Sequence, residues 1–229
     1  MPHIPLPTTQ QKNKKMNITN DIITQYIHSF YKPIDEKFRQ IRETSERAGV
    51  PIILKETENF LTFFLGLTKP KNVLEIGTAV GYSAMVFANF GANVITIEKN
   101  ENMAQAAINN IESMGFDSQI KVLIGDGREA LENLNDKPNS FDLVFIDAAK
   151  SHYKAFLEGA LPYCHQGTII VSDNVLLKGS TASEEFDTKG RFRTNIKKMR
   201  LYLEYISNHP KLDTTIITSG DGLALSRCI

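Results

Sequence analysis

The feature that most constrains the fold is a glycine-containing turn between two apolar segments. Residues 73–76 read Val-Leu-Glu-Ile, Gly77 and Gly81 follow, and a second apolar run begins at Tyr82. The composition of the two segments predicts a strand, a tight loop and a helix. Glycine lets the backbone approach a bound molecule without a side chain in the way, and the first turn of a helix offers unpaired N–H groups. The turn therefore predicts a ligand site.

A second strand segment, residues 93–98, supplies an acidic residue that belongs with this turn. Its last residue, Glu98, lies about 20 residues after Gly77, the spacing at which an acid binds ribose hydroxyls in nucleotide-binding folds. The glycines do not match the G-x-G-x-x-G pattern of dinucleotide sites. The two features together favour a ligand that carries a nucleoside without a pyrophosphate, and a plain tight connection is the structural alternative.

Strand and helix segments alternate through most of the chain. We expect strands over residues 72–76, 93–98, 120–124, 141–146 and 167–172, and helices over residues 82–90, 101–114, 128–133, 152–163 and about 191–208. This alternation predicts an α/β fold with a parallel sheet covered by helices on both faces. Segments 214–218 and 223–226 flank Gly220-Asp221-Gly222 and predict a final hairpin. We therefore expect a seven-stranded, mostly parallel sheet with an antiparallel strand at its edge.

Length and composition favour a single domain, because 229 residues with 41% apolar content can bury one core. Residues 1–16 contain three prolines and three lysines and predict a flexible tail. Residues 17–70 predict a helical cap, with two helices separated at Lys32-Pro33 and a third, largely buried helix over residues 55–67. Residues 71–229 form the expected core.

Charge and cysteine content exclude several classes of function. The 26 basic and 26 acidic side chains cancel, so the global charge predicts no polyanion partner, although local clusters can still bind one. Cys164 and Cys228 lack metal-ligand spacing and are expected to be inert thiols in a reducing cytosol. No apolar run approaches the roughly 18 residues that a membrane span needs. We expect a cytoplasmic protein without a membrane partner.

Five predicted strands end in a glycine or an oxygen-bearing side chain. These residues are Gly77, Glu98, Asp126, Asp147 and the pair Asp173-Asn174. Each one alone could be a helix cap or a turn residue. Ligands of open parallel sheets bind at the carboxyl ends of the strands, where all five would meet. The set as a whole therefore favours a functional site.

Within this set, Asp147, Asp173 and Asn174 are the candidate metal ligands. Two carboxylates and an amide oxygen can hold an octahedral Mg²⁺ and leave positions for water and substrate. No histidine or cysteine belongs to the set, which argues against zinc. A cation with open positions would bind a hydroxyl together with an adjacent oxygen and lower the pKa of the hydroxyl.

Lys150 is the candidate base, because it stands three residues after Asp147 and could accept the proton of the substrate. A solvated lysine at a helix start is the alternative. His152 is a rival base, and we favour it less because a histidine in the first helical turn is more often exposed than catalytic.

Residues 189–200 carry six basic side chains and no acid, in a chain whose charges otherwise balance. Such a run is commonly the solvated face of a helix. Because it closely follows the loop after the predicted metal ligands, a basic surface beside the site would suit a phosphate-bearing substrate such as RNA.

Taken together, these motifs resemble those of the cation-dependent O-methyltransferases, which include the catechol and caffeoyl-CoA methyltransferases. The motifs are residues 75–83, Ile97-Glu98, Gly125-Asp126, residues 145–150 and residues 172–176. The resemblance covers residues 17–229. It implies a Rossmann-like class I fold that binds S-adenosylmethionine, and N-terminal helices that build a homodimer interface and a lid over the substrate.

The resemblance also implies a role for each matching residue. S-Adenosylmethionine would contact Ile53, Gly77, Tyr82, Ser83, Glu98, Asp126, Gly127 and Asp147. Mg²⁺ would be held by Asp147, Asp173 and Asn174, and Asp147 and Lys150 would be catalytic, with Lys150 matching the catalytic lysine of the family. Position 53 is Ile where relatives often have Met, a difference that affects packing more than chemistry.

Four further segments most resemble the bacterial branch that methylates 5-hydroxyuridine at the tRNA wobble position to 5-methoxyuridine. They are residues 174–179, the basic run, residues 208–210 and residues 220–226. The implied partner is the anticodon loop of tRNA, contacted by Lys178, Arg191, Arg193 and Lys197. 5-Hydroxyuridine presents O4 and a 5-hydroxyl on neighbouring carbons, the same chelating pair that a catechol offers. The alternative acceptor is a catechol-like or caffeoyl-CoA-like small molecule. A non-catalytic sensor of S-adenosylmethionine is a further alternative, against which the intact site residues argue.

Overall fold

A computed structural model of the chain describes residues 18, 20–134 and 138–229, so the tail predicted over residues 1–16 lies outside the described residues. Seven strands in these residues form one sheet in the order β3-β2-β1-β4-β5-β7-β6. The strands are β1 (Asn72–Ile76), β2 (Asn93–Glu98), β3 (Ile120–Ile124), β4 (Phe141–Ile146), β5 (Cys164–Ser172), β6 (Leu212–Ile217) and β7 (Leu223–Cys228). The first four have the bounds predicted from the sequence, and β5 begins three residues earlier than expected.

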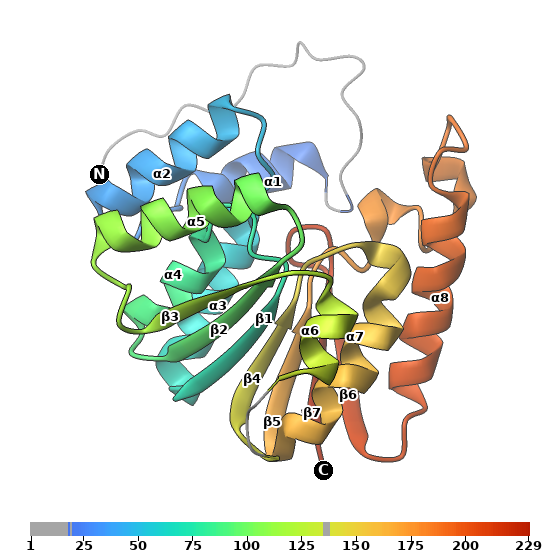
Figure 1. Ribbon diagram of the computed structural model, residues 1–229. Coiled ribbons are helices and arrows are strands. Elements are labelled where there is room, and N and C mark those ends of the chain that lie inside the picture. The colour runs from blue at the N-terminus through green and yellow to red at the C-terminus, as the bar shows by residue number, and fades with distance from the viewer. Residues whose placement is uncertain (1–17, 19, 135–137) are drawn as a thin grey trace.

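The helices cover both faces of the sheet, as predicted. They are α1 (Asp21–His28), α2 (Glu36–Arg47), α3 (Lys55–Thr68), α4 (Tyr82–Asn89), α5 (Glu101–Met114), α6 (Gly127–Glu132), α7 (Tyr153–Ala160) and α8 (Arg193–Ser207). Helices α3, α4 and α5 pack on one face, and α6, α7 and α8 pack on the other (Figure 1). The single helix predicted over residues 152–163 is wrong at both ends, where the short 3₁₀ turns Lys150–His152 and Leu161–Tyr163 flank α7. Pro162 lacks the N–H that would continue the helix.

The sheet is parallel from β3 to β5 and antiparallel at the β6 side, which confirms the predicted antiparallel edge. The hairpin from β6 to β7 does not extend the sheet outward. Instead β7 lies between β5 and β6, antiparallel to both, and β6 forms the edge. This arrangement places the turn at Gly220 and Gly222 next to the loop that follows β5, because Val175 and Leu176 donate backbone hydrogen bonds to Gly222 and Asp221.

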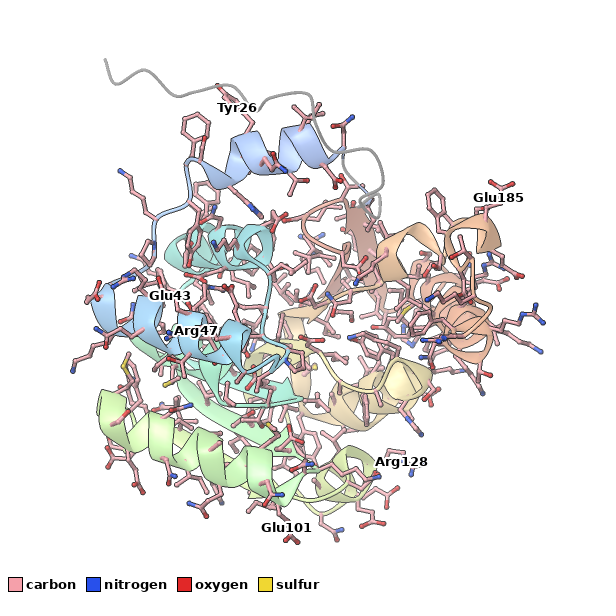
Figure 2. The ribbon with its side chains drawn as sticks, turned by 90° about the horizontal axis from the view of Figure 1, so that it is seen from above. Tyr26, Glu43, Arg47, Glu101, Arg128 and Glu185 are labelled. Carbon is pink, nitrogen blue, oxygen red and sulfur yellow. The ribbon has the colours of Figure 1, made fainter. Side chains whose placement is uncertain are left out.

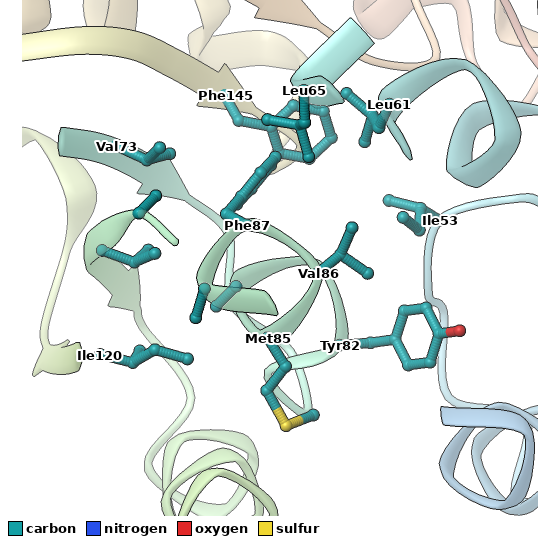
Figure 3. Close-up of a cluster of buried hydrophobic side chains, with 14 of the residues drawn as sticks. Ile53, Leu61, Leu65, Val73, Tyr82, Met85, Val86, Phe87, Ile120 and Phe145 are labelled. Carbon is teal, nitrogen blue, oxygen red and sulfur yellow. The ribbon is translucent and has the colours of Figure 1, made fainter. Parts of the chain in front are cut away.

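The core consists of two clusters of buried apolar side chains, one on each face of the sheet. Leu74 and Val144 are fully buried in the central strands, as expected for parallel strands covered on both faces. Figure 3 shows the cluster on the α3 and α4 face, where Phe87 packs edge-on against Phe145 with ring centroids 5.4 Å apart. This rigid core positions the carboxyl ends of the strands.

The third helix is less buried than the sequence predicted. Leu61 and Leu65 are fully buried, whereas Phe63 and Leu67 are 70% and 68% exposed, so only one face of α3 meets the core. Helix α1 also presents apolar side chains to solvent, and Figure 2 shows Tyr26 at the outer rim of the molecule. Burial of these faces between two subunits stays a prediction. Among the described residues, no helix combines the length and the apolar character that crossing a bilayer requires.

Candidate active site

A cavity of about 620 Å³ lies at the carboxyl ends of the strands and gathers most of the predicted site residues. Its wall includes every residue to which the sequence assigned cofactor binding: Ile53, Gly77, Tyr82, Ser83, Glu98, Asp126, Gly127 and Asp147. Lys150, His152 and Asn174 also line it. Asp173 is fully buried directly behind this wall. The strand ends predicted to converge therefore do meet at one cavity, and they come from residues up to 97 positions apart, between Gly77 and Asn174.

The glycine turn allows two strand ends to meet at the cavity. Gly77 has a φ of +103°, and a Cβ at this position would lie 2.0 Å from the backbone oxygen of Asp147. The sequence argument assigned Gly77 to the approach of a ligand. The structure adds a second reason for glycine, because the ends of β1 and β4 pack too closely for any side chain.

Glu98 is tied to the backbone on either side of the cavity entrance. Its Oε2 accepts a hydrogen bond of 2.8 Å from the backbone N–H of Ala79, and its Oε1 accepts one of 2.8 Å from Asn100. Because both oxygens are held by backbone donors, the carboxylate has a fixed direction. A fixed carboxylate at the end of β2 can receive the two hydroxyls of a ribose.

Asp126 caps α6 by accepting a hydrogen bond of 3.1 Å from the backbone N–H of Arg128. The side-chain hydrogen bond from Arg128, its backbone hydrogen bond and one from Lys99 lower the pKa of Asp126 to about 2. Beside it, a Cβ on Gly127 would lie 2.9 Å from the ring of Phe156. Sequence reasoning missed Phe156 because a ring on α7 carries no local sign that it packs beneath the start of α6.

A buried acid under the glycine turn was also missed. Glu75 in β1 is fully buried, and its Oε2 accepts a hydrogen bond from Thr96 Oγ1, which is also hydrogen-bonded to Thr78. Burial raises the pKa of Glu75 to about 8, against the opposing effect of hydrogen bonds from Ser83 and Thr96. The available signal was a charged residue inside an otherwise apolar strand.

The other half of the cavity is a chain of polar contacts. Lys150 Nζ forms an ion pair of 2.8 Å with Asp147 Oδ1 and donates a hydrogen bond of 2.7 Å to the hydroxyl of Tyr153. The Tyr153 hydroxyl donates in turn to the backbone oxygen of Asp173 at 2.8 Å. The candidate base is thus connected to two of the three candidate metal ligands, directly to Asp147 and to Asp173 through Tyr153, which the sequence analysis did not single out.

Asp173 has one satisfied and one unsatisfied carboxylate oxygen. Its Oδ1 accepts a hydrogen bond of 2.6 Å from the backbone N–H of Asn174, whereas Oδ2 is buried without a partner among the described residues. Burial, followed by the nearby charge of Asp147, raises the pKa of Asp173 well above its usual range. A bare buried oxygen beside a second carboxylate fits a hard cation, whose charge would offset both effects.

The candidate metal site needs the side-chain amide of Asn174 as its third ligand. In the described part of the chain, no group of three or more His, Cys, Asp or Glu side chains is placed to hold an ion. Asp147 and Asp173 therefore reach three ligands only with Asn174, which follows β5 in the left-handed conformation, with a φ of +57°. Asparagine is one of the few residues that adopts this conformation readily.

The four predicted RNA contacts lie outside the cavity. The backbone N–H of Lys178 donates to Asp221 Oδ1, and Arg191, Arg193 and Lys197 are exposed at the start of α8. Arg200 from the same basic run is engaged by Glu184 and by the backbone oxygen of Thr181. The structure thus brings the cofactor and metal candidates together and leaves the basic residues on the adjacent surface.

Comparison with known proteins places the chain in a family. The family model described as O-methyltransferase matches residues 28–229. A catechol O-methyltransferase of Mycobacterium tuberculosis is 33% identical over 80% of this chain and 84% of its own length. A Staphylococcus aureus structure, reported as a candidate caffeoyl-CoA O-methyltransferase, has a TM-score of 0.85 at 33% identity, over 91% of this chain and 100% of the other.

A third relative is an O-methyltransferase from Bacillus cereus that was crystallised in complex with S-adenosylhomocysteine. It has a TM-score of 0.78 at 27% identity, over 90% of this chain and 97% of the other. The match of the family model and the similarity of the full-length relatives agree with the site geometry. The chain therefore belongs to the O-methyltransferase family.

Proposed function

We propose that this O-methyltransferase transfers the methyl group of S-adenosylmethionine to the 5-hydroxyl of 5-hydroxyuridine in the anticodon loop of tRNA. The observation that carries the proposal is that one cavity contains two sets of groups. Glu98 and Asp126 suit a nucleoside-bearing donor, and Asp147, Lys150 and Asn174 suit an acceptor with two adjacent oxygens. The Bacillus cereus relative in complex with S-adenosylhomocysteine supports the choice of donor.

On the donor side, Glu98 receives the ribose hydroxyls, and Asp126 and Gly127 contact the rest of the nucleoside. Ser83 and Tyr82 at the start of α4, together with Ile53, enclose the part of the donor that carries the sulfonium. Holding donor and acceptor in line makes the transfer effectively unimolecular. The methyl carbon leaves sulfur as it bonds to the acceptor oxygen, and S-adenosylhomocysteine is the product.

On the acceptor side, Asp147, Asp173 and Asn174 would hold a divalent cation such as Mg²⁺. When bound, the cation supplies a fixed binding direction for two adjacent oxygens and a lowered hydroxyl pKa. Lys150 accepts the proton of the acceptor hydroxyl at Nζ, once its ammonium has lost a proton to solvent and its ion pair with Asp147 has opened. Tyr153 keeps Nζ close to the acceptor while this happens.

Charge distribution supports RNA as the acceptor. In the described part of the chain, Arg191, Arg193 and Lys197 form no ion pair, although the whole sequence has equal numbers of acidic and basic side chains. Unpaired cations beside a site attract a phosphate backbone. A base in an anticodon loop is already unpaired, so turning it into the cavity costs less than extracting one from a duplex.

A catechol-like small molecule is the second candidate acceptor. The catechol O-methyltransferase of Mycobacterium tuberculosis, at 33% identity, favours it. Both acceptors offer two oxygens on neighbouring carbons, so the same groups would serve either one. The two candidates differ in whether the surface of α8 takes part.

A comparison of acceptors tests the proposal. The purified full chain is given radiolabelled S-adenosylmethionine with bulk tRNA from a strain that lacks the enzyme, or with catechol or caffeate. We expect label in tRNA, and mass spectrometry of its nucleosides should show 5-methoxyuridine. Transfer of label to catechol and caffeate alike, with none to tRNA, would reject RNA as the acceptor.

A further inference from the structure

Residues 50–54, called the strap below, form a thin wall of the donor cavity. The strap connects α2 to α3 and follows Gly49, whose φ is +69°. Pro51, Ile52 and Ile53 line the main cavity and also line a second cavity of about 320 Å³ on the other side. Ile53 is buried in the core cluster, and Ile52 packs partly against it. Apolar packing is not directional, so the position of the strap backbone also depends on a directed hydrogen bond from a neighbouring element.

Arg42 supplies that interaction. Its Nη2 donates a hydrogen bond of 3.0 Å to the backbone oxygen of Ile53, and its side chain is only 3% exposed. The same guanidinium binds Glu58 Oε2 through Nη2 and through Nε, the latter at 3.1 Å. Glu58 lies on α3 and is 1% exposed. The planar guanidinium thus joins α2, the strap and α3 through one rigid group.

The same charge pair also contacts a second part of the cavity wall. The Tyr82 hydroxyl donates a hydrogen bond of 2.9 Å to Glu58 Oε2, and the Arg42 Cζ lies 4.7 Å from the centre of the Tyr82 ring. Tyr82 begins α4 and lines the cavity, and Figure 3 shows it reaching from α4 towards the strap, on the side where Ile53 lies. Arg42 and Glu58 themselves do not line the cavity. They contact Ile53 and Tyr82, two residues of its wall.

Stability alone does not explain a charge pair at this position. Replacing a buried ion pair by apolar residues of similar volume is often neutral or stabilising, because both charges lose their hydration. The pair lies beside an apolar core cluster that includes Ile53 and Tyr82. What an apolar pair could not supply is a directed bond to the Ile53 carbonyl and to the Tyr82 hydroxyl at the same time.

We infer that Arg42 and Glu58 are positioning residues that set the width of the donor cavity by fixing the strap to the start of α4. The inference rests on the proposed function only in taking this cavity as the donor site. When the pair is intact, Ile53 and Tyr82 stand at a fixed separation, and the donor meets a preformed pocket. When the pair is weakened, the strap moves towards the second cavity and the donor must order it again upon binding.

The test uses Arg42→Lys, which keeps the positive charge but replaces the planar guanidinium by a single ammonium. The ammonium cannot donate hydrogen bonds to Glu58 and to the Ile53 carbonyl with the same geometry. S-Adenosylhomocysteine is titrated calorimetrically, and kcat and KM for S-adenosylmethionine are measured with saturating acceptor. We expect Kd and KM to rise about tenfold, the effect of removing one hydrogen bond to a charged group. We expect kcat to stay within about twofold, because Asp147 and Lys150 are untouched.

Two variants separate positioning from stability. Arg39→Lys alters the exposed arginine on the same helix, which pairs with Glu36 and Glu43, and should leave Kd and Tm unchanged. Tyr31→Phe removes hydrogen bonds of 3.0 Å to Glu58 but keeps the bond from Arg42 to the strap and the bond from Tyr82 to Glu58. It should lower Tm while leaving Kd unchanged. Faster amide hydrogen exchange over residues 50–54 should accompany Arg42→Lys alone.

The outcomes are distinguishable. Wild-type affinity for S-adenosylhomocysteine in Arg42→Lys, with unchanged exchange over the strap, overturns the inference. If the wild-type protein itself does not bind S-adenosylhomocysteine, the donor assignment fails, and the exchange data still report whether Arg42 holds the strap. If Arg42→Lys does not fold, Tyr82→Phe serves instead. It removes one hydroxyl, and an unchanged Kd in that variant counts against the inference.

Discussion

The two halves of the cavity are built by different means. On the donor side, Glu98 is held by backbone N–H groups of the turns that follow β1 and β2, and Asp126 by the backbone N–H of Arg128 in α6. On the acceptor side, Asp147 and Lys150 are held by one another, and Asp173 keeps a buried oxygen without a partner among the described residues. The two donor-side carboxylates that line the cavity are therefore held without a ligand, whereas Asp173 on the acceptor side keeps an oxygen that is unsatisfied in the described part of the chain. This difference indicates which substitutions should affect the chemistry alone and which should affect the fold.

The largest effect is expected from Asp173→Ala, which tests whether the acceptor side is catalytic rather than structural. We expect methyl transfer to fall about a thousandfold, because a charged ligand is removed from the place where the acceptor is oriented. Affinity for S-adenosylhomocysteine and the free energy of unfolding should change little, since a buried carboxylate with an unsatisfied oxygen adds no stability. Transfer that persists undiminished in this variant with a chelator present would remove the acceptor side from the mechanism.

The second largest effect should come from Gly77→Ala, which tests the junction between the two halves. A Cβ at Gly77 would lie 2.0 Å from the backbone oxygen of Asp147, so β1 and β4 must separate. We expect a decrease of about 3 kcal/mol in unfolding free energy and weaker binding of S-adenosylhomocysteine. Gly91→Ala is the control, because Gly91 has a φ of +87° with nothing within 4 Å, and only the backbone strain of about 1 kcal/mol applies. If urea titrations gave the same decrease in unfolding free energy for Gly77→Ala and Gly91→Ala, the predicted clash with the Asp147 backbone would be contradicted.

Glu75→Gln should have an intermediate, pH-dependent effect and tests the buried support of the donor side. Because the folded pKa of Glu75, about 8, lies above its unfolded value of 4.5, its contribution to stability is complete below pH 4.5 and is lost as the pH rises through 8. The glutamine variant cannot ionise. We expect the variant to become more stable relative to wild type, by on the order of 2 kcal/mol, between pH 6 and pH 8. Parallel unfolding curves across this range would show that Glu75 titrates normally.

The smallest effect is expected on the surface, from Arg193→Ala combined with Lys197→Ala. If the acceptor side continues onto α8 because the acceptor is RNA, KM for tRNA should rise about tenfold at moderate salt. The salt dependence should then weaken by about one unit of slope for each phosphate that the variant no longer neutralises. Transfer to catechol should not change. Lys121→Ala removes an exposed lysine on β3 as the control. An unchanged KM for tRNA would confine the acceptor-binding groups to the cavity.

The sequence by itself determined most of the strand and helix pattern and named many of the residues that line the cavity. β1, β2, β3 and β4 have the predicted bounds, and Glu98 lies where its spacing from Gly77 placed it. This was possible because hydrophobic periodicity and turn residues are local, and because parallel strands place their carboxyl ends at one edge of the sheet. The same logic brought Asp147, Lys150 and Asn174 to the cavity.

Only the tertiary structure decided the interactions between residues that are distant in the chain. It placed β7 between β5 and β6, left Phe63 exposed on α3, and brought Phe156 beneath Gly127. It also joined Arg42 to Ile53 and Tyr82 to Glu58 across several elements. A local pattern cannot encode such pairings, because each depends on how whole elements pack, and packing is settled by the summed burial of many side chains rather than by any one of them.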